Sequence, residues 1–162
     1  MGEYLDKRCR CQKFEIIGVC GRDKKHAYWG YDRLEGIEPA TFQTAGWLFM
    51  KDKNGVYYEG ELIKSADPHT FVALGTVPYG KDRKYIYRGL LKIRKADPNT
   101  FEVINNNYSK DNNRVFYNSQ RTKRADPTTF IILTKGYAKD ENHVYYKGKV
   151  MTEAETKGLK IE

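Results

Sequence analysis

The residues in this sequence that could hold a metal ion are gathered near the N-terminus. Cys9, Cys11 and Cys20 are the three cysteines of the chain, and His26 follows them closely. Three thiolates and one imidazole form a ligand set that tetrahedral Zn²⁺ accepts. However, the Cys-x-Cys spacing is unusual for a structural site, and Cys20 falls where later copies of a repeat place an aromatic residue. We therefore interpret Cys20 as a small core residue and expect no metal or other cofactor.

The sequence offers no pair of residues for nucleophilic or general-base catalysis. His26 and His143 each lie three residues after an aspartate of the repeat, but glycine, tyrosine and arginine hold that place in other copies. His69 lies in a turn where an exposed position is expected. The Asp-x-Asn turns lack the dense carboxylate ligands that Ca²⁺ requires. Because no Ser, Cys or His is fixed beside a base, we predict that the protein is not an enzyme.

Basic residues recur at fixed places in the chain, whose net charge is +8. One set directly precedes the turn aspartates: Arg22, Lys51, Lys81, Lys110 and Lys139. A denser set precedes the Asp-Pro turns, beginning with Lys64. Its later members are our candidate partner-binding residues: Lys92, Arg94, Lys95, Arg121, Lys123 and Arg124. Stacked repeats would align this set along one edge, either as a solvated face that blocks edge-strand pairing or as a binding surface.

The elements that must position these residues are copies of one repeat. The stretch 51–74 contains Asp52, then Val56-Tyr57-Tyr58, then Ala66-Asp67-Pro68 and Thr70-Phe71. The series returns twice, with a looser copy before it and a final copy that lacks the Asp-Pro turn. The prolines at positions 39, 68, 98 and 127 give a period of about 29 residues, and a regular period of this size indicates a repeat architecture.

Each copy is interpreted as three short strands. The first runs from the phenylalanine toward the next tyrosine, the second is Val-Tyr-Tyr or a variant, and the third carries one apolar residue or threonine. The sequence therefore predicts an all-β fold of five tandem three-stranded repeats in a meander. We favour an open β-solenoid over a small propeller-like ring, because propeller blades need about 40 residues.

We expect a single domain over residues 1–162, with an N-terminal cap at 1–13, five repeats at 14–151 and a C-terminal cap at 152–162. Thr152 and Glu155 have the spacing of a capping box, which predicts a short C-terminal helix. No run approaches the roughly 20 apolar residues of a membrane span, and no secretory signal is visible. Together with an odd number of cysteines, this composition predicts a cytoplasmic protein.

The pattern D-K-N…V-Y-Y…A-D-P-x-T-F resembles the DKNYY repeat family of bacterial proteins over about residues 14–151. The copies with Asp67, Asp97 and Asp126 match it well. Glu38 replaces the aspartate in the first copy, and Lys84-Tyr85 replaces the asparagine-containing turn in the third. The resemblance implies a bacterial β-rich repeat protein and brings no catalytic residues with it.

We expect a non-enzymatic binding protein whose basic edge docks an acidic protein. A bacterial immunity protein that neutralises a toxin with an acidic face is one such class. The alternative is a nucleic-acid-binding protein that uses the basic stripe and exposed tyrosines as a stacking platform. One aromatic recurs in the second strand of every copy, and its apolar neighbours favour burial over exposure: Tyr28, Tyr57, Tyr87, Phe116 and Tyr145.

Overall fold

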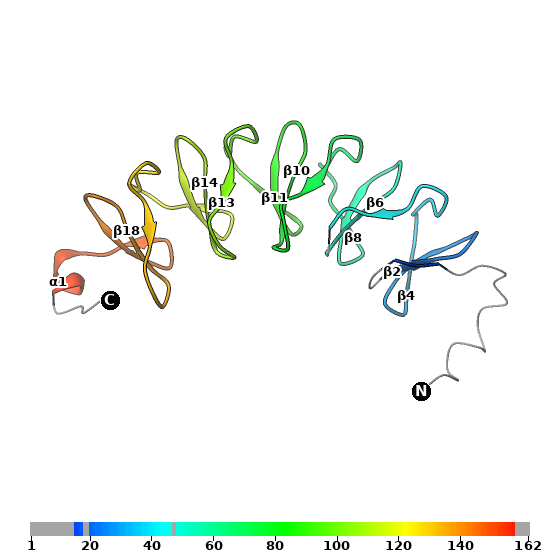
Figure 1. Cartoon of the computed structure of the whole chain (residues 1–162), viewed down its shortest axis with the longest axis horizontal. Coiled ribbons are helices and arrows are strands. Elements are labelled where there is room, and N and C mark those ends of the chain that lie inside the picture. The colour runs from blue at the N-terminus through cyan, green and yellow to red at the C-terminus, as the bar shows by residue number, and fades with distance from the viewer. Residues whose placement is uncertain (1–14, 18–19, 47, 158–162) are drawn as a thin grey trace. The chain divides into compact units, whose positions relative to one another are not determined.

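A computed structural model of the chain describes residues 15–17, 20–46 and 48–157. Within them, short strands form five four-stranded sheets, and neighbouring strands in each sheet are also neighbours in the sequence (Figure 1). All the pairings between strands are antiparallel in the sheets for which the register is described. The prediction of an all-β tandem-repeat fold is confirmed. Whether the array is open or closed stays a prediction, as does the single domain.

The chain divides into two compact units, Met1–Ala73 and Leu74–Glu162. The first unit holds two complete sheets and strand β9. The first sheet contains β1 (Glu15–Ile17), β2 (Cys20–Arg22), β3 (Ala27–Trp29) and β4 (Asp32–Leu34). The second contains β5 (Gln43–Thr44), β6 (Phe49–Lys51), β7 (Val56–Tyr58) and β8 (Glu61–Leu62), and β9 is Val72–Ala73. The predicted N-terminal cap at 1–13 lies outside the described residues.

The second unit holds three strands of the next sheet, two complete sheets and one helix. The three strands are β10 (Tyr79–Lys81), β11 (Ile86–Arg88) and β12 (Leu91–Ile93). The fourth repeat contains β13 (Glu102–Val103), β14 (Tyr108–Lys110), β15 (Val115–Tyr117) and β16 (Gln120–Arg121). The fifth contains β17 (Ile131–Ile132), β18 (Tyr137–Lys139), β19 (Val144–Tyr146) and β20 (Lys149–Val150), followed by α1 (Glu153–Thr156).

Each sheet has four strands, so the prediction of three strands in each repeat is wrong. The segment from Phe101 to Tyr108 forms β13, a turn and β14 instead of a single strand. The backbone N–H groups of Ile104 and Asn105 both donate to Tyr108 O at 3.0 Å. The Asn105 side chain accepts from the backbone N–H groups of Asn107 and Tyr108. Because asparagine readily bonds nearby backbone in this way, the chain reverses inside a segment that otherwise favours strand.

In the second unit, the phenylalanines that lead the fourth and fifth repeats pack between two sheets. Phe130 is buried, with ring centroids 5.3 Å from Tyr108 in β14 and 5.6 Å from Tyr145 in β19. Phe101 has the same role one repeat earlier, between Tyr79 at 6.0 Å and Phe116 at 6.2 Å, although it is only half-buried. These aromatic contacts join successive sheets of the second unit, because a four-stranded sheet of this size does not bury a core by itself.

The C-terminal capping box is confirmed. Thr152 Oγ1 accepts from the backbone N–H of Glu155 at 3.3 Å, and the Thr152 N–H donates to Glu155 Oε2 at 2.7 Å. These two bonds satisfy backbone and side-chain groups at the start of α1. The helix is one turn long and carries no buried residue.

The fourth repeat contains a polar defect whose removal should stabilise the protein. Thr122 stands where other repeats place Ile63 and Ile93, and its Oγ1 is buried without a hydrogen-bond partner among the described residues. A buried hydroxyl of this kind costs about 1–3 kcal/mol. Thr122→Val should therefore raise the free energy of unfolding by about 1–2 kcal/mol in urea titrations.

The matched control is Thr44→Val, which makes the same change at an exposed strand position. It should alter the free energy of unfolding by no more than about 0.5 kcal/mol. A Thr122→Val protein less stable than the parent would show that the hydroxyl has a favourable partner.

Candidate partner-binding surface

A buried aspartate closes the turn between the second and third strands of every repeat. Asp52 Oδ1 accepts from the backbone N–H groups of Asn54 at 2.9 Å and Gly55 at 2.8 Å. The Asp52 N–H in turn donates to Gly55 O at 3.1 Å. The sequence folds this way because a short acidic side chain can bond the backbone two and three residues ahead. The equivalent carboxylates are also buried: Asp23, Asp82, Asp111 and Asp140.

The same carboxylate holds the aromatic ring five residues later. The Tyr87 hydroxyl donates to Asp82 Oδ2 at 2.8 Å, and the Tyr145 hydroxyl donates to Asp140 Oδ2 at 2.7 Å. In the second repeat, burial together with the Asp52 charge raises the pKa of Tyr57 to about 12. The expected burial of the aligned rings is confirmed at positions 57, 87, 116 and 145, and Tyr28 is half-buried. These rings therefore form no exposed stacking platform.

In three repeats, the turn aspartate also joins its sheet to the turn that ends the preceding repeat. Asp140 Oδ2 accepts from the backbone N–H of Asp126 at 2.9 Å, and Asp111 Oδ2 accepts from that of Asp97 at 3.0 Å. In the first unit, Asp52 Oδ2 accepts from the Glu38 N–H at 2.7 Å. The bond uses the backbone, so the departure at Glu38 does not disturb it.

The basic residues that precede the turn aspartates have structural roles. Lys81 Nζ donates to Pro98 O at 3.1 Å, and Lys110 Nζ donates to Pro127 O at 3.2 Å. Lys51 Nζ reaches Phe71 O at 3.1 Å, and Arg22 Nη1 reaches Phe42 O at 2.9 Å. These cations satisfy carbonyls of the following turn, so they are not available as a binding row. Lys139, in the last repeat, is exposed.

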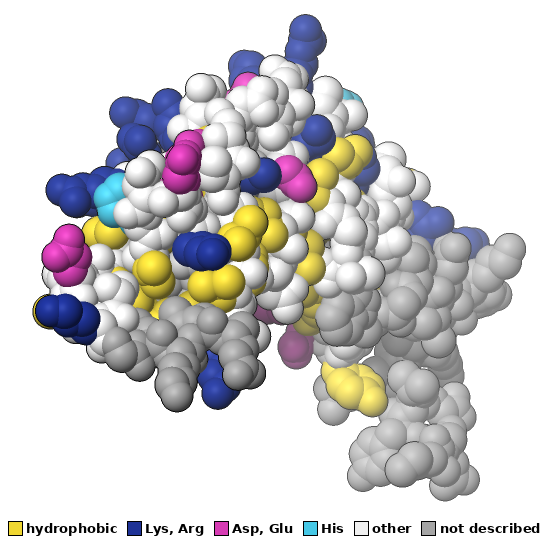
Figure 2. Space-filling view, turned by 60° about the vertical axis from the view of Figure 1, so that its left-hand side comes forward, with side chains coloured by type: hydrophobic (Ala, Val, Ile, Leu, Met, Phe, Trp, Pro, Cys, Tyr) yellow, Lys and Arg dark blue, Asp and Glu magenta, His cyan; other side chains and the backbone are white. Residues whose placement is uncertain are grey.

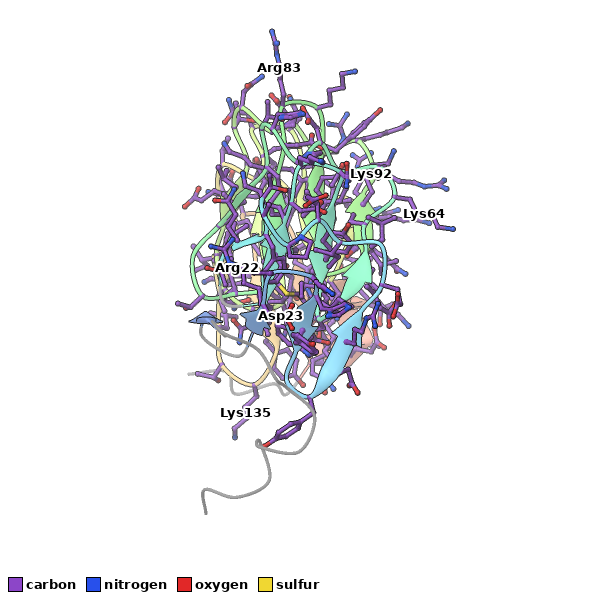
Figure 3. The ribbon with its side chains drawn as sticks, turned by 90° about the vertical axis from the view of Figure 1, so that its right-hand side faces the viewer. Arg22, Asp23, Lys64, Arg83, Lys92 and Lys135 are labelled. Atoms are coloured by element: carbon purple, nitrogen blue, oxygen red, sulfur yellow. The ribbon has the colours of Figure 1, made fainter. Side chains whose placement is uncertain are left out.

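The six predicted binding residues are all exposed and all lie in the second unit. Lys92 lies in β12 and Arg121 lies in β16, which are edge strands of their sheets. Arg94 and Lys95 occupy the turn after β12, and Lys123 and Arg124 occupy the turn after β16. Lys92 projects away from the ribbon in Figure 3. In Figure 2, Lys and Arg side chains are spread over the visible face while Asp and Glu are few.

Arg114, which was not among the predicted binding residues, links the first basic turn to the fourth repeat. Its Nη1 donates to Lys95 O at 3.0 Å, and the same nitrogen lies 3.8 Å from Asp111 Oδ2. The turn that carries Arg94 and Lys95 is thereby held against the repeat that carries Arg121. The signal was its position, three residues after the turn aspartate, where a long cation can reach the preceding repeat.

Two residues of the basic set have a backbone conformation that side chains with a Cβ rarely adopt. Lys95 and Arg124 both have φ of 63°, in the left-handed region, and the first repeat places Gly36 there with φ of 75°. For a residue with a Cβ, this backbone conformation costs roughly 1–2 kcal/mol, whereas glycine adopts it without that cost. The two cations therefore occupy positions that the backbone alone would assign to glycine.

The second unit carries the whole net charge of the protein. Residues 74–162 contain 18 Lys and Arg against 10 Asp and Glu, whereas residues 1–73 contain 11 of each. Three of the acids in the second unit are the buried turn aspartates. Asp97 and Asp126 bond their own turns, through Asn99 N at 2.9 Å and Thr128 N at 2.8 Å respectively. Few carboxylates remain to neutralise the exposed cations.

The expected core role of Cys20 is confirmed, because its side chain is buried in the cluster that includes Phe42 and Tyr57. Burial raises the pKa of the Cys20 thiol to about 11, so the thiolate that a metal or a nucleophilic reaction needs is disfavoured. Cys9 and Cys11 lie outside the described residues. His26 Nδ1 lies 3.6 Å from Asp23 Oδ1, and His143 Nδ1 lies 3.7 Å from Asp140 Oδ1.

Over the residues that the structure describes, no group of three His, Cys, Asp or Glu side chains could hold a metal ion. In the same residues, no helix is long and apolar enough to cross a membrane. The absence of a cofactor and of catalytic activity stays a prediction.

Comparison with known families supports the resemblance seen in the sequence. A model of the DKNYY family matches residues 4–61 and 21–149. The chain belongs to the DKNYY family. No curated protein and no solved structure matches it.

The letters of the DKNYY motif correspond to the turn described above. In the second repeat, Asp52 accepts the turn bonds, and Asn54 supplies one of the donors. The first tyrosine, Tyr57, donates its hydroxyl to Asp52 at 3.4 Å. The second, Tyr58, packs edge-on against Phe49 with ring centroids 5.1 Å apart. The aspartate, the asparagine and the first tyrosine of the motif therefore form one hydrogen-bonded unit.

Replacing a turn carboxylate should lower the free energy of unfolding and make that free energy less sensitive to acid pH. Asp140 accepts from the N–H groups of Asn142, His143 and Asp126 and from the Tyr145 hydroxyl. Burial raises the pKa of Asp140, but these bonds outweigh it and hold the pKa below the ordinary value. Asp140→Asn should cost about 1.5–3 kcal/mol at neutral pH in urea unfolding, because bonds to a charged acceptor are lost.

The pH dependence follows from the lowered pKa in the folded state. The contribution of Asp140 is fully present above the unfolded pKa of about 4 and is lost as the pH falls through the lower folded value. The free energy of unfolding should therefore drop below about pH 4, less steeply in Asp140→Asn. Glu141→Gln, at the exposed neighbouring position, is the control and should match the parent. Identical acid profiles for the parent and Asp140→Asn would contradict the role of this carboxylate.

Proposed function

We propose that this DKNYY protein is a non-enzymatic binding protein that docks an acidic protein partner through its second unit. The binding surface consists of the six exposed cations, referred to below as the basic surface: Lys92, Arg94, Lys95, Arg121, Lys123 and Arg124. The observation that carries the proposal is the exposure of all six cations on the edge strands of two successive repeats and on the turns that follow those strands. Lys95 and Arg124 keep a left-handed backbone in these turns, as Glu59, Lys135 and Lys147 do in other turns.

The distribution of charge supports the same proposal. The acids of the second unit are largely committed to turns, and the cations that stabilise turn carbonyls are a separate set. The cations of the basic surface thus create a positive field that the molecule itself does not neutralise. Fields of this kind increase the association rate with an oppositely charged partner and reject like-charged ones.

Within this class, an immunity protein that neutralises a toxin with an acidic face is the specific role that we propose. This role requires association without a chemical reaction, and exposed charges on turns steer such association. We propose the bacterial cytoplasm as the compartment, since Cys20 is a free thiol and reducing compartments keep thiols unpaired.

The burial of Tyr57, Tyr87 and Tyr145 favours a protein partner over nucleic acid, because the aligned rings are not available to stack on bases. A nucleic-acid partner would have to bind through phosphate contacts alone. Such binding weakens steeply with salt, as each contacted phosphate releases a counterion. Salt dependence therefore separates the two classes.

The test reverses two charges of the basic surface. Arg94→Glu with Lys123→Glu should change the free energy of unfolding by no more than about 0.5 kcal/mol per site, because both residues are exposed. Association with the protein partner captured from the native host should slow sharply at low salt, and the difference from the parent should shrink at high salt, because salt screens rim charges. Thermal melts and association rates at two salt concentrations measure both effects.

Two further variants sharpen this test. Lys135→Glu makes the same charge change on an exposed residue of the second unit that points away from a different side of the ribbon (Figure 3). It should leave association unchanged. Lys95→Gly with Arg124→Gly should preserve stability, because relief of the left-handed conformation offsets the flexibility of glycine, while association still slows. Undiminished binding in both double variants would overturn the basic surface as the site.

A further inference from the structure

We infer that Tyr85 is the apolar anchor of the basic surface, so that the partner presents an acidic segment carrying an apolar side chain. This inference rests on the proposed function and specifies the chemistry of the partner. Tyr85 is 39% exposed, whereas Tyr87, two residues further along the chain, is completely buried. The third repeat thus places one tyrosine in the core and offers the other to solvent.

The position of Tyr85 is fixed by the turn that carries it. The Tyr85 N–H donates to Asp82 Oδ1 at 2.7 Å, and the Asp82 N–H donates to Tyr85 O at 3.0 Å. Asp82 itself is buried. Because both bonds exist before any partner arrives, binding at this ring requires little ordering of the backbone. Preorganised aromatic residues of this kind contribute strongly to interfaces.

Tyr85 lies against Lys92, a member of the basic surface. Lys92 Nζ is 3.9 Å from the centre of the Tyr85 ring, which is a close cation–π contact. The contact follows from the geometry of the repeat. In the second repeat, the same two places hold Gly55 and Leu62, and a Cβ added to Gly55 would lie 2.7 Å from Leu62 Cδ1. The two positions therefore face each other, and only the third repeat fills them with a tyrosine and a lysine.

The chemistry of this pair selects the partner. The Lys92 ammonium, with exposed Arg94 after it on the same edge, suits carboxylates, whereas the ring needs an apolar group to bury. Tyrosine beside cations is the composition that dominates the energetic centres of protein interfaces. A purely acidic segment would satisfy the charges and leave the ring exposed. A segment with alternating acidic and apolar residues satisfies both.

The experiment uses the full chain and two short fluorescein-labelled peptides of equal length and charge. One alternates Glu with Leu, and the other alternates Glu with Ser. Fluorescence anisotropy should give a lower Kd for the Glu–Leu peptide. Tyr85→Ala should raise that Kd by about tenfold, the loss typical of a truncated interface aromatic, and leave the Glu–Ser peptide unaffected. Tyr31→Ala, at a tyrosine of the first unit that is 95% exposed, is the control and should change neither Kd.

The outcomes separate the anchor from the proposed function. Equal binding of both peptides, or a Tyr85→Ala protein that still prefers the Glu–Leu peptide, would overturn Tyr85 as the anchor while leaving the basic surface in place. Failure to bind either peptide would overturn the proposed docking of acidic segments and the anchor with it. Tighter binding of a labelled oligothymidine than of either peptide, lost in Tyr85→Ala, would assign the ring to nucleic-acid stacking and overturn the inference.

Discussion

The buried carboxylate of the turn aspartate is the constraint on which this fold depends. Its Oδ1 closes the local turn, and its Oδ2 holds a backbone N–H of the preceding Asp-Pro turn. In the fifth repeat, Asp140 also holds the Tyr145 ring in the core. A sheet whose strands have two or three residues is too small to be stable alone. One carboxylate therefore converts a local turn into a joint between repeats, which explains why the period centres on it.

This use of carboxylates determines where the charge of the protein appears. Asp82, Asp111 and Asp140 are turned inward, and Lys81 and Lys110 satisfy turn carbonyls. The six cations of the basic surface lie on edge strands and on the turns that follow them. There they oppose edge-to-edge pairing and remain exposed for binding. The two interpretations of this stripe are therefore compatible.

The sequence was sufficient to predict the repeat, the burial of the aligned rings, the core role of Cys20 and the Thr152 capping box. It was not sufficient for the fourth strand of each repeat. In the fourth repeat, the reversal depends on hydrogen bonds that Asn105 accepts from nearby backbone, in a segment that we interpreted as one strand. The candidate cations were found by type and period. Tyr85 and Arg114 were missed, since their contacts with Lys92 and Lys95 depend on which positions face each other after folding.

The same backbone supports different side chains, and so different surfaces, in different repeats. Phe116 replaces the tyrosine that bonds the turn aspartate in other repeats, and in that repeat Arg114 lies 3.8 Å from Asp111 instead. The turn thus survives the exchange of one partner because another group supports the charge. The third position after the aspartate contributes its backbone N–H in the described turn bonds of Gly55, Tyr85 and His143, so the turn closes with different side chains at this position. That freedom lets each repeat present a different group at the same place, and it is why we assign recognition to this position and the facing edge strand.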